Sequence, residues 1–200
     1  MSLNNGNFTA DIAAEFNESI YVKQQVIEGH LSVINEIANL LIESLQAGNK
    51  VLLFGNGGSA ADSQHIAGEL VSKFRRVRKA MPAIALTTDT SILTSIGNDF
   101  GYDYVFARQI EALGQAGDVA IGISTSGNSP NVLRALQAAR DIGMTSVGFT
   151  GQSGGQMQDC VDICFNAPSD STPRIQEVHI TAGHIVCELV EKTLVDSSDA

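Results

Sequence analysis

The chain has 200 residues, of which 44% are hydrophobic and 17% are charged, and its formal net charge is −10. This length suits one full α/β domain and excludes two large ones. The negative charge argues against a general nucleic-acid-binding protein, because affinity for DNA and RNA comes mostly from clustered Lys and Arg.

Membrane and export signals are not expected either. No apolar run approaches the ~18 residues that a transmembrane helix needs, and the first residues lack the basic and apolar regions of a signal peptide. The three cysteines have no metal-finger spacing and suit reduced thiols. We therefore expect a cytoplasmic protein without a membrane or nucleic-acid partner. One basic run, residues 73–79, is expected to be either a solvated helix end or a local anion contact.

The N-terminal quarter of the chain has a helical pattern. Apolar residues recur at helical spacing between Ile12 and Gln46, and Gly48 follows as a stop signal, which predicts two helices arranged as an N-terminal hairpin. Because this pair is apolar enough to require a partner, the pattern also indicates an oligomer.

Five short apolar runs rich in strand-forming residues follow: Lys50–Gly55, Ala83–Leu86, Asp118–Ser124, Thr145–Thr150 and Val161–Asn166. Helical patterns separate the first four runs, and a long helix is expected over Arg174–Leu194. Continuously apolar strands that alternate with helices indicate a parallel sheet covered on both faces. We predict an α/β fold with one domain over residues 1–200, in which helices within residues 1–48 precede an αβα core over residues 49–195.

The first and third of these runs end in turns rich in glycine and hydroxyl groups, "GNGGSAAD" and "STSGNSPN". Each turn precedes a helix at the carboxyl end of a strand, where open α/β sheets bind ligands and helix N-termini attract anions. The alternative is a pair of ordinary turns with Ser caps. "GNGGSA" matches neither a dinucleotide fingerprint nor a Walker loop, so a monophosphate fits better than a nucleotide. The hydroxyls expected to hold it belong to Ser124, Thr125, Ser126 and Ser129.

A histidine and a glutamate follow on the helix that starts at the first turn. His65 and Glu69 are four residues apart and share one helix face, which suits either a functional pair or a solvated surface pair. The last helix adds Gln176, His179 and His184 among its apolar positions. Imidazole, carboxylate and amide oxygen together form a ligand set that zinc or manganese accepts.

Four segments resemble the phosphoheptose isomerases of the sugar isomerase (SIS) superfamily: "FGNGGSAADSQHIAGELVSKF", "LTTDTSILTSIGNDFGYDYVFARQI", "GDVAIGISTSGNSPNVLRAL" and "RIQEVHITAGHIVCELVE". The resemblance runs from about Tyr21 to Leu194. It implies a three-layer αβα sandwich with five parallel strands, in a homotetramer with active sites at subunit interfaces. It also implies conversion of sedoheptulose 7-phosphate to D-glycero-D-manno-heptose 7-phosphate, the first step towards nucleotide-activated heptoses of lipopolysaccharide cores.

The resemblance implies roles for individual residues as well. It implies one zinc ion per subunit, held by His65, Glu69, Gln176 and His184. For isomerisation through an enediol, Glu69 is expected to move the carbon-bound proton and His184 to act as acid and base at oxygen. The phosphate cradle is the group of four hydroxyl residues named above. The other substrate contacts that the resemblance implies are Asn56, Gly57, Gly58, Glu69, Asn98, Asp99 and Gln176.

Two questions stay open at this point. Gln176 and His184 are eight residues apart, ~12 Å along a helix, so one ion reaches both only if Gln176 frays at the helix start or a neighbouring subunit supplies a ligand. Some SIS proteins close to this family associate with the bacterial replication initiator, and they lack the counterparts of Gly58, Glu69 and His184. The main alternative is therefore a non-catalytic protein that binds a sugar phosphate or the initiator, followed by another sugar-phosphate isomerase.

Overall fold

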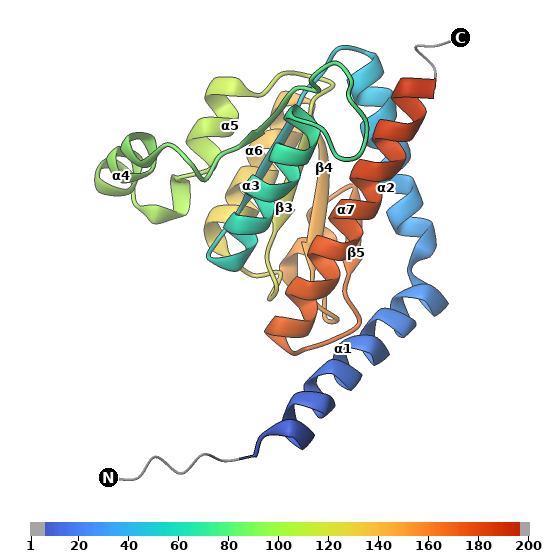
Figure 1. Cartoon of the computed structure of the whole chain (residues 1–200). Coiled ribbons are helices and arrows are strands. Elements are labelled where there is room, and N and C mark those ends of the chain that lie inside the picture. Colours follow the sequence, from blue (N-terminus) through green and yellow to red (C-terminus); the bar gives the residue numbers. More distant parts are fainter. Residues whose placement is uncertain (1–6, 197–200) are drawn as a thin grey trace.

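The computed structural model describes residues 7–196, so the ends of the predicted domain, residues 1–6 and 197–200, lie outside the described part (Figure 1). The elements are, in chain order, α1 (Thr9–Gly29), α2 (Leu31–Gln46), β1 (Val51–Gly55), α3 (Gly58–Val71), β2 (Ala83–Ala85), α4 (Thr90–Asp99), α5 (Ala107–Leu113), β3 (Val119–Ile123), α6 (Pro130–Ile142), β4 (Thr145–Thr150), β5 (Ile163–Asn166) and α7 (Thr172–Asp196). Single 3-10 turns lie at Tyr102–Tyr104 and Gly155–Asp159.

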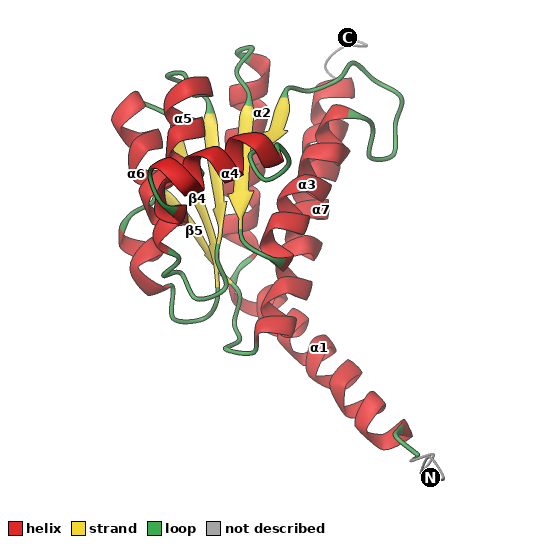
Figure 2. Ribbon diagram, turned by 90° about the vertical axis from the view of Figure 1, so that its left-hand side faces the viewer, coloured by secondary structure: helices red, strands yellow, loops and turns green. Residues whose placement is uncertain are grey.

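The five strands form one parallel sheet in the order β2-β1-β3-β4-β5. The central pair is in register from Val51 opposite Val119 to Gly55 opposite Ile123. Every residue of β1 and β3 is buried, because helices cover both faces of the sheet and leave no polar side (Figure 2). The predicted α/β class and the five parallel strands are confirmed.

Alternate residues of each strand point into two separate cores. Leu53 and Ile121 pack with α2, α3 and α7 on one face, whereas Phe54 packs with α5 and α6 on the other. The molecule is therefore the expected three-layer sandwich. No helix within residues 7–196 is long and apolar enough to span a membrane.

The two N-terminal helices differ from the prediction of a hairpin, which is wrong. His30 alone separates α1 from α2, and one residue is too short a link for the chain to reverse between two packed helices. Helix α1 instead leaves the body as an arm (Figures 1 and 2). Its C-terminal half packs on the core through the buried Val22 and Val26. Nearer its start, Nη1 of Arg174 on α7 donates to the Glu15 carbonyl oxygen at 2.7 Å.

Candidate active site

The carboxyl edge of the sheet places the two predicted turns side by side. Strands β1 and β3 are neighbours, but the chain visits β2 between them on the other side of β1, so the strand order reverses at this point. Crevices at such a reversal are the usual ligand sites of open α/β sheets. Helix α3 starts at Gly58 and α6 starts directly after Ser129, so the free N–H groups of both helices face the same edge.

The first turn holds two successive glycines: the backbone conformation favours glycine at Gly57, and Gly58 lies against the end of the Gln176 side chain. Gly57 has φ +55° and ψ −120°, a conformation that side-chain-bearing residues rarely adopt. A side chain at Gly58 would collide with the Gln176 amide, whose Cδ would lie 2.9 Å from the added Cβ. Gln176 thus lies against the start of α3.

The hydroxyl groups of the second turn form a small network. Ser124 is 4% exposed, and its Oγ lies 2.9 Å from Ser129 Oγ and 3.4 Å from Ser126 Oγ. Thr125 and Ser126 line a cavity of about 450 Å³. Ser124 therefore lies beneath the turn and holds its neighbours, while Thr125 and Ser126 face the open space.

Two further segments line the same cavity and were missed by the sequence reasoning. Residues 151–153 follow β4, and residues 169–172 join β5 to α7. Both are rich in glycine or hydroxyl groups and follow the carboxyl ends of strands. The rule that identified the first two turns would have found these two as well if it had been applied to every strand.

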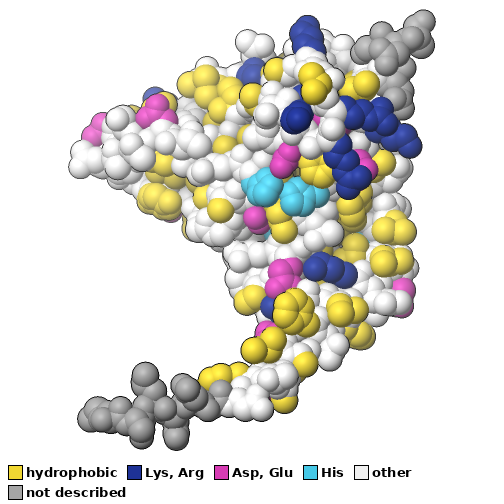
Figure 3. All heavy atoms as spheres, in the orientation of Figure 1, with side chains coloured by type: hydrophobic (Ala, Val, Ile, Leu, Met, Phe, Trp, Pro, Cys, Tyr) yellow, Lys and Arg dark blue, Asp and Glu magenta, His cyan; other side chains and the backbone are white. Residues whose placement is uncertain are grey.

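The centre of the site is a group of three donor atoms from α3 and α7. His65 Nε2 lies 3.2 Å from Glu69 Oε1 and 3.1 Å from His184 Nε2, and the three ligand atoms all lie within 4.8 Å of one another. The histidines lie on the concave side of the molecule, between the projecting α4 and α1 (Figure 3). Structure thus brings together residues that are 119 positions apart.

The converging donor set fits a bound metal ion. His65 directs one ring nitrogen at both an imidazole nitrogen and a carboxylate oxygen, and a single N–H cannot serve both. Two imidazoles and a carboxylate are ligands that zinc accepts, with bonds of ~2.0–2.2 Å that place neighbouring ligand atoms ~3.3 Å apart in a tetrahedron. The two spacings that involve His65 Nε2, 3.2 and 3.1 Å, match this arrangement.

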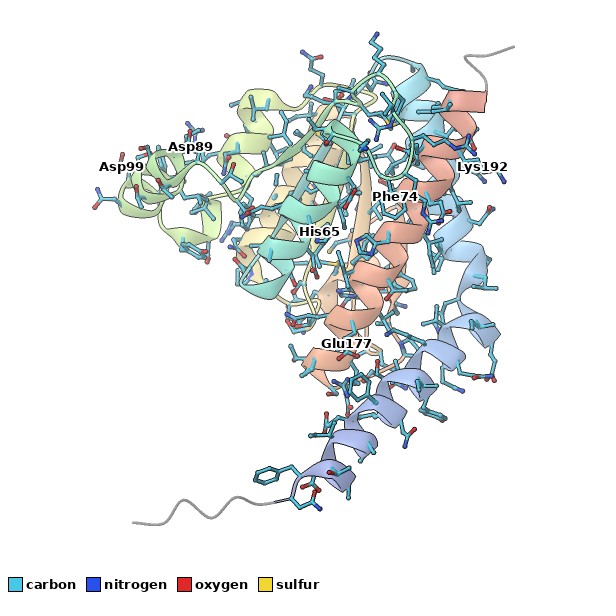
Figure 4. The ribbon with its side chains drawn as sticks, viewed as in Figure 1. His65, Phe74, Asp89, Asp99, Glu177 and Lys192 are labelled. Carbon is cyan, nitrogen blue, oxygen red and sulfur yellow. The ribbon has the colours of Figure 1, made fainter. Side chains whose placement is uncertain are left out.

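Three of the predicted site residues lie away from this group within one chain. Gln176 lies at Gly58, seven residues before His65 and thus ~10 Å away along α3. Asn98 and Asp99 end the exposed helix α4, where Asn98 Nδ2 donates to Asp99 Oδ1 at 2.8 Å. Figure 4 shows Asp99 at the outer side of α4, well separated from His65.

The basic run after α3 braces the two helices that carry the group. Arg78 donates to the carbonyl oxygens of Leu70 and Glu69 at 2.7 and 2.8 Å, and its Nε lies 3.2 Å from Glu191 Oε1 on α7. Glu191 also accepts the backbone N–H groups of Phe74, Arg75 and Arg76. These hydrogen bonds hold the pKa of the Glu191 carboxyl below its usual value, although burial alone would raise it. Arg78 and the backbone of this segment therefore form a structural clamp. The side chains of Lys73, Arg75 and Lys79 are exposed, as the expectation of a solvated helix end had it.

One buried carboxylate oxygen of α3 near the metal-binding geometry has no hydrogen bond among the described residues. Asp62 lies one turn before His65 on α3, and its Oδ2 is buried without a hydrogen bond. Burial raises the pKa of Asp62, and the nearby His65 partly opposes this. The site therefore combines exposed donor atoms with one carboxyl group that is poorly solvated.

The sequence is similar to a known family and to several known proteins. The family model described as "SIS domain" matches residues 16–151. A phosphoheptose isomerase of Roseiflexus sp. (strain RS-1) is 58% identical over 190 residues, covering 95% of this chain and 96% of the relative. The phosphoheptose isomerase of Aquifex aeolicus (strain VF5) is 55% identical over 183 residues, covering 92% and 96%.

Among solved structures, two phosphoheptose isomerases resemble this chain over more than nine tenths of its length. Phosphoheptose isomerase GmhA from Neisseria gonorrhoeae is 43% identical with a TM-score of 0.89, covering 93% of this chain and 100% of that one. A phosphoheptose isomerase from Francisella tularensis is 35% identical with a TM-score of 0.90, covering 94% and 100%.

Proposed function

Because the chain belongs to the phosphoheptose isomerases of the SIS-domain family, we propose that its His65–Glu69–His184 group performs the isomerisation and its second turn holds the substrate phosphate. The enzyme converts sedoheptulose 7-phosphate to D-glycero-D-manno-heptose 7-phosphate, the first step towards nucleotide-activated heptoses. The observation that carries the mechanism is the convergence of an acidic and two imidazole side chains from α3 and α7. A hydroxyl-lined cavity lies at the start of α7, nearer the carboxyl edge of the sheet.

Neutral donors hold the phosphate in this proposal. Thr125 and Ser126 offer hydroxyls at the cavity, and the first N–H groups of α6 add the positive end of a helix. Such a cradle needs few cations, which accords with a chain of net charge −10.

The proton moves between the first two carbons of the sugar. Glu69 removes a proton from C1 of the open-chain ketose, the C1–C2 double bond of the enediol forms, and the C2 carbonyl oxygen takes a proton from His184. Glu69 then returns its proton to C2, while the C1 hydroxyl gives its proton back to His184 and becomes the aldehyde. One base and one acid–base partner suffice, since each ends as it began.

A metal ion fits the same residues. His65, Glu69 and His184 would hold zinc, and a bound zinc ion would polarise the substrate oxygens as a Lewis acid. Gln176 contributes to this group only if it moves from Gly58 or comes from another copy. A carboxylate that also binds the metal is a weaker base, so the two roles of Glu69 compete.

Assembly into a homotetramer would complete the site. Asn98 and Asp99 reach substrate if α4 of one copy borders the site of another, which is consistent with their distance from His65 in one chain. Helix α1 supports the assembly, because large exposed apolar side chains form a stripe along it at a spacing of four, beginning with Phe8 just before the helix and continuing with Ile12, Phe16 and Ile20. A cytoplasmic location remains part of the proposal.

The test is incubation of purified protein with sedoheptulose 7-phosphate, read by NMR for the new aldose phosphate. We expect conversion that falls after chelation and returns with zinc. Full turnover of verified metal-free protein would remove zinc from the chemistry. Absence of conversion with and without zinc would favour the non-catalytic alternative that binds a sugar phosphate or the replication initiator.

A further inference from the structure

Two asparagines from the two ligand-binding turns form a reciprocal amide pair. Asn56 Nδ2 donates to Asn131 Oδ1 at 2.9 Å, and Asn131 Nδ2 donates to Asn56 Oδ1 at 2.9 Å. Asn56 belongs to the turn between β1 and α3, and Asn131 is the second residue of α6. The pair therefore joins the two turns across the crevice.

Because Asn131 is buried, its amide depends on Asn56 for its hydrogen bonds. Asn131 is 3% exposed, so its amide has no water to replace a lost partner, and an unpaired buried amide is costly. A 180° flip of the Asn56 amide would place nitrogen against nitrogen and oxygen against oxygen. The two amides can therefore change orientation only together, so Asn131 couples the face of Asn56 that carries the donor to its own orientation.

The pair leaves Asn56 with capacity to bind something else. An amide nitrogen has two N–H groups and its oxygen two lone pairs, and the pair uses one of each. The Tyr102 hydroxyl lies 3.5 Å from Asn56 Oδ1 and donates to the same oxygen. One N–H of Asn56 stays outside the pair, in the turn where the substrate is expected.

We propose that Asn131 is a positioning residue of the isomerase, which acts through Asn56. It orients the free N–H of Asn56 towards a substrate hydroxyl and sets the spacing between the first turn and the phosphate-binding turn. This inference rests on the proposed function, because that function makes Asn56 a substrate contact.

The test is a double-mutant cycle on kcat/KM for sedoheptulose 7-phosphate with Asn56→Ala, Asn131→Ala and the double variant. We expect Asn131→Ala to lower kcat/KM about ten- to a hundredfold, as misplacement of a binding group does. In the Asn56→Ala background the same change should cost less than about threefold, because the group that Asn131 orients is already gone. Inhibition by inorganic phosphate should stay unchanged, since the hydroxyl cradle is intact.

Matched variants separate positioning from simple destabilisation. Gln109→Leu removes another buried amide, 6% exposed, whose Nε2 donates to the carbonyl oxygens of Leu86 and Val105. It should lower stability and leave kcat/KM within about twofold. If Asn131→Ala does not fold, Asn131→Asp replaces it in the cycle, because a carboxylate accepts from Asn56 but cannot donate back.

Two results would overturn the inference: unchanged kcat/KM in the folded Asn131 variant, or an equal loss in both backgrounds. If the wild-type enzyme shows no turnover, the proposed function fails, and the same cycle is then measured on substrate affinity by calorimetry. Coupled losses of affinity would still support the pair as a binding device, and additive losses would overturn it.

Discussion

At the scale of single residues, the phosphate site relies on hydroxyl groups whose positions are set by one another. Ser124 is buried and lies within hydrogen-bonding distance of both Ser126 and Ser129, so the exposed hydroxyl of Ser126 is held in place from below. A hydrogen bond to a charged group contributes ~1.5–3 kcal/mol, which makes this arrangement testable by deletion of one oxygen.

We expect Ser126→Ala to lower kcat/KM by at least about tenfold, because one donor to the phosphate is lost. Steady-state kinetics with sedoheptulose 7-phosphate measures the effect. Thr145→Val is the control, since Thr145 is the first residue of β4 and lies at the amino ends of the strands, away from the phosphate site at their carboxyl ends. Normal kinetics in both Ser126→Ala and Ser124→Ala would place the phosphate elsewhere.

A second residue-scale prediction concerns pH and the buried His179. Its Nε2 lies 3.0 Å from the Thr150 carbonyl oxygen, and burial lowers the pKa of this imidazole from 6.5 to about 4. The unfolded chain therefore binds more protons than the folded one between these values, so stability is full above about pH 6.5 and falls towards pH 4. The loss over that window is about 3 kcal/mol.

Urea unfolding at pH 7.5 and pH 5 tests this dependence. His179→Phe should be less stable at both values but less sensitive to pH, because Phe fits among Phe149 and Phe165 without titrating. The other histidines are present in both the wild type and the variant, so their titration affects the two proteins equally. An unchanged pH dependence in His179→Phe would assign the effect to other groups.

At the scale of elements, the packing interface between the parallel helices α3 and α7, called the seam below, determines where the site residues meet. Gln176 of α7 contacts Gly58 of α3, and His184 of α7 contacts His65 of α3. A Cβ atom added at Gly183 would lie only 2.7 Å from Ile66 Cδ1. Gly183 thus permits the close approach that brings the two histidines together. Arg78 and Glu191 hold the far end of the same seam.

We predict that Glu191→Gln lowers the free energy of unfolding by about 3 kcal/mol, because it leaves the Arg78 guanidinium buried without its counter-charge. The two side chains are 6% and 3% exposed. Glu188→Gln is the matched control on the same helix, since its pair with Arg75 is 66% and 43% exposed and should matter by less than about 1 kcal/mol. Denaturant unfolding that gave equal losses for the two variants would contradict the clamp.

The sequence predicts the secondary-structure elements well, but it does not predict how neighbouring helices pack against one another. Hydrophobic runs located all five strands, and the four-residue spacing placed His65 and Glu69 on one face. The approach of His184 depends on the register between two helices, which periodicity within either helix does not contain. The hairpin failed for a similar reason: the pattern of α1 and α2 is helical, but the single residue His30 between them decides their angle.

At the scale of the whole molecule, α1 and α4 project from the body (Figure 1) and carry exposed apolar side chains, while α4 also carries the predicted site residues Asn98 and Asp99. We expect a tetramer of ~84 kDa, since closed symmetric assembly buries such faces and each chain has a mass of 21.1 kDa.

Light scattering measures the assembly. Phe16→Asp should shift the enzyme to smaller species with lower activity, because Phe16 is 69% exposed at the centre of the α1 stripe. Asn17→Asp adds the same charge beside the stripe and should leave the mass unchanged. A wild-type monomer with full activity would be incompatible with sites shared between copies.

In the proposed mechanism, Glu69 carries the proton between the first two carbons of the sugar. The most direct measurement is exchange of the carbon-bound proton of sedoheptulose 7-phosphate with deuterated water, followed by NMR in wild type and Glu69→Gln. The variant must first be shown to be folded, assembled and able to bind substrate by calorimetry. Gln keeps the size and one oxygen but cannot accept the proton, so we predict exchange in the wild type and a fall of ~10²–10⁴ in the variant. Exchange at the wild-type rate in Glu69→Gln would contradict the account and move the base to His184 or to a residue of a neighbouring subunit.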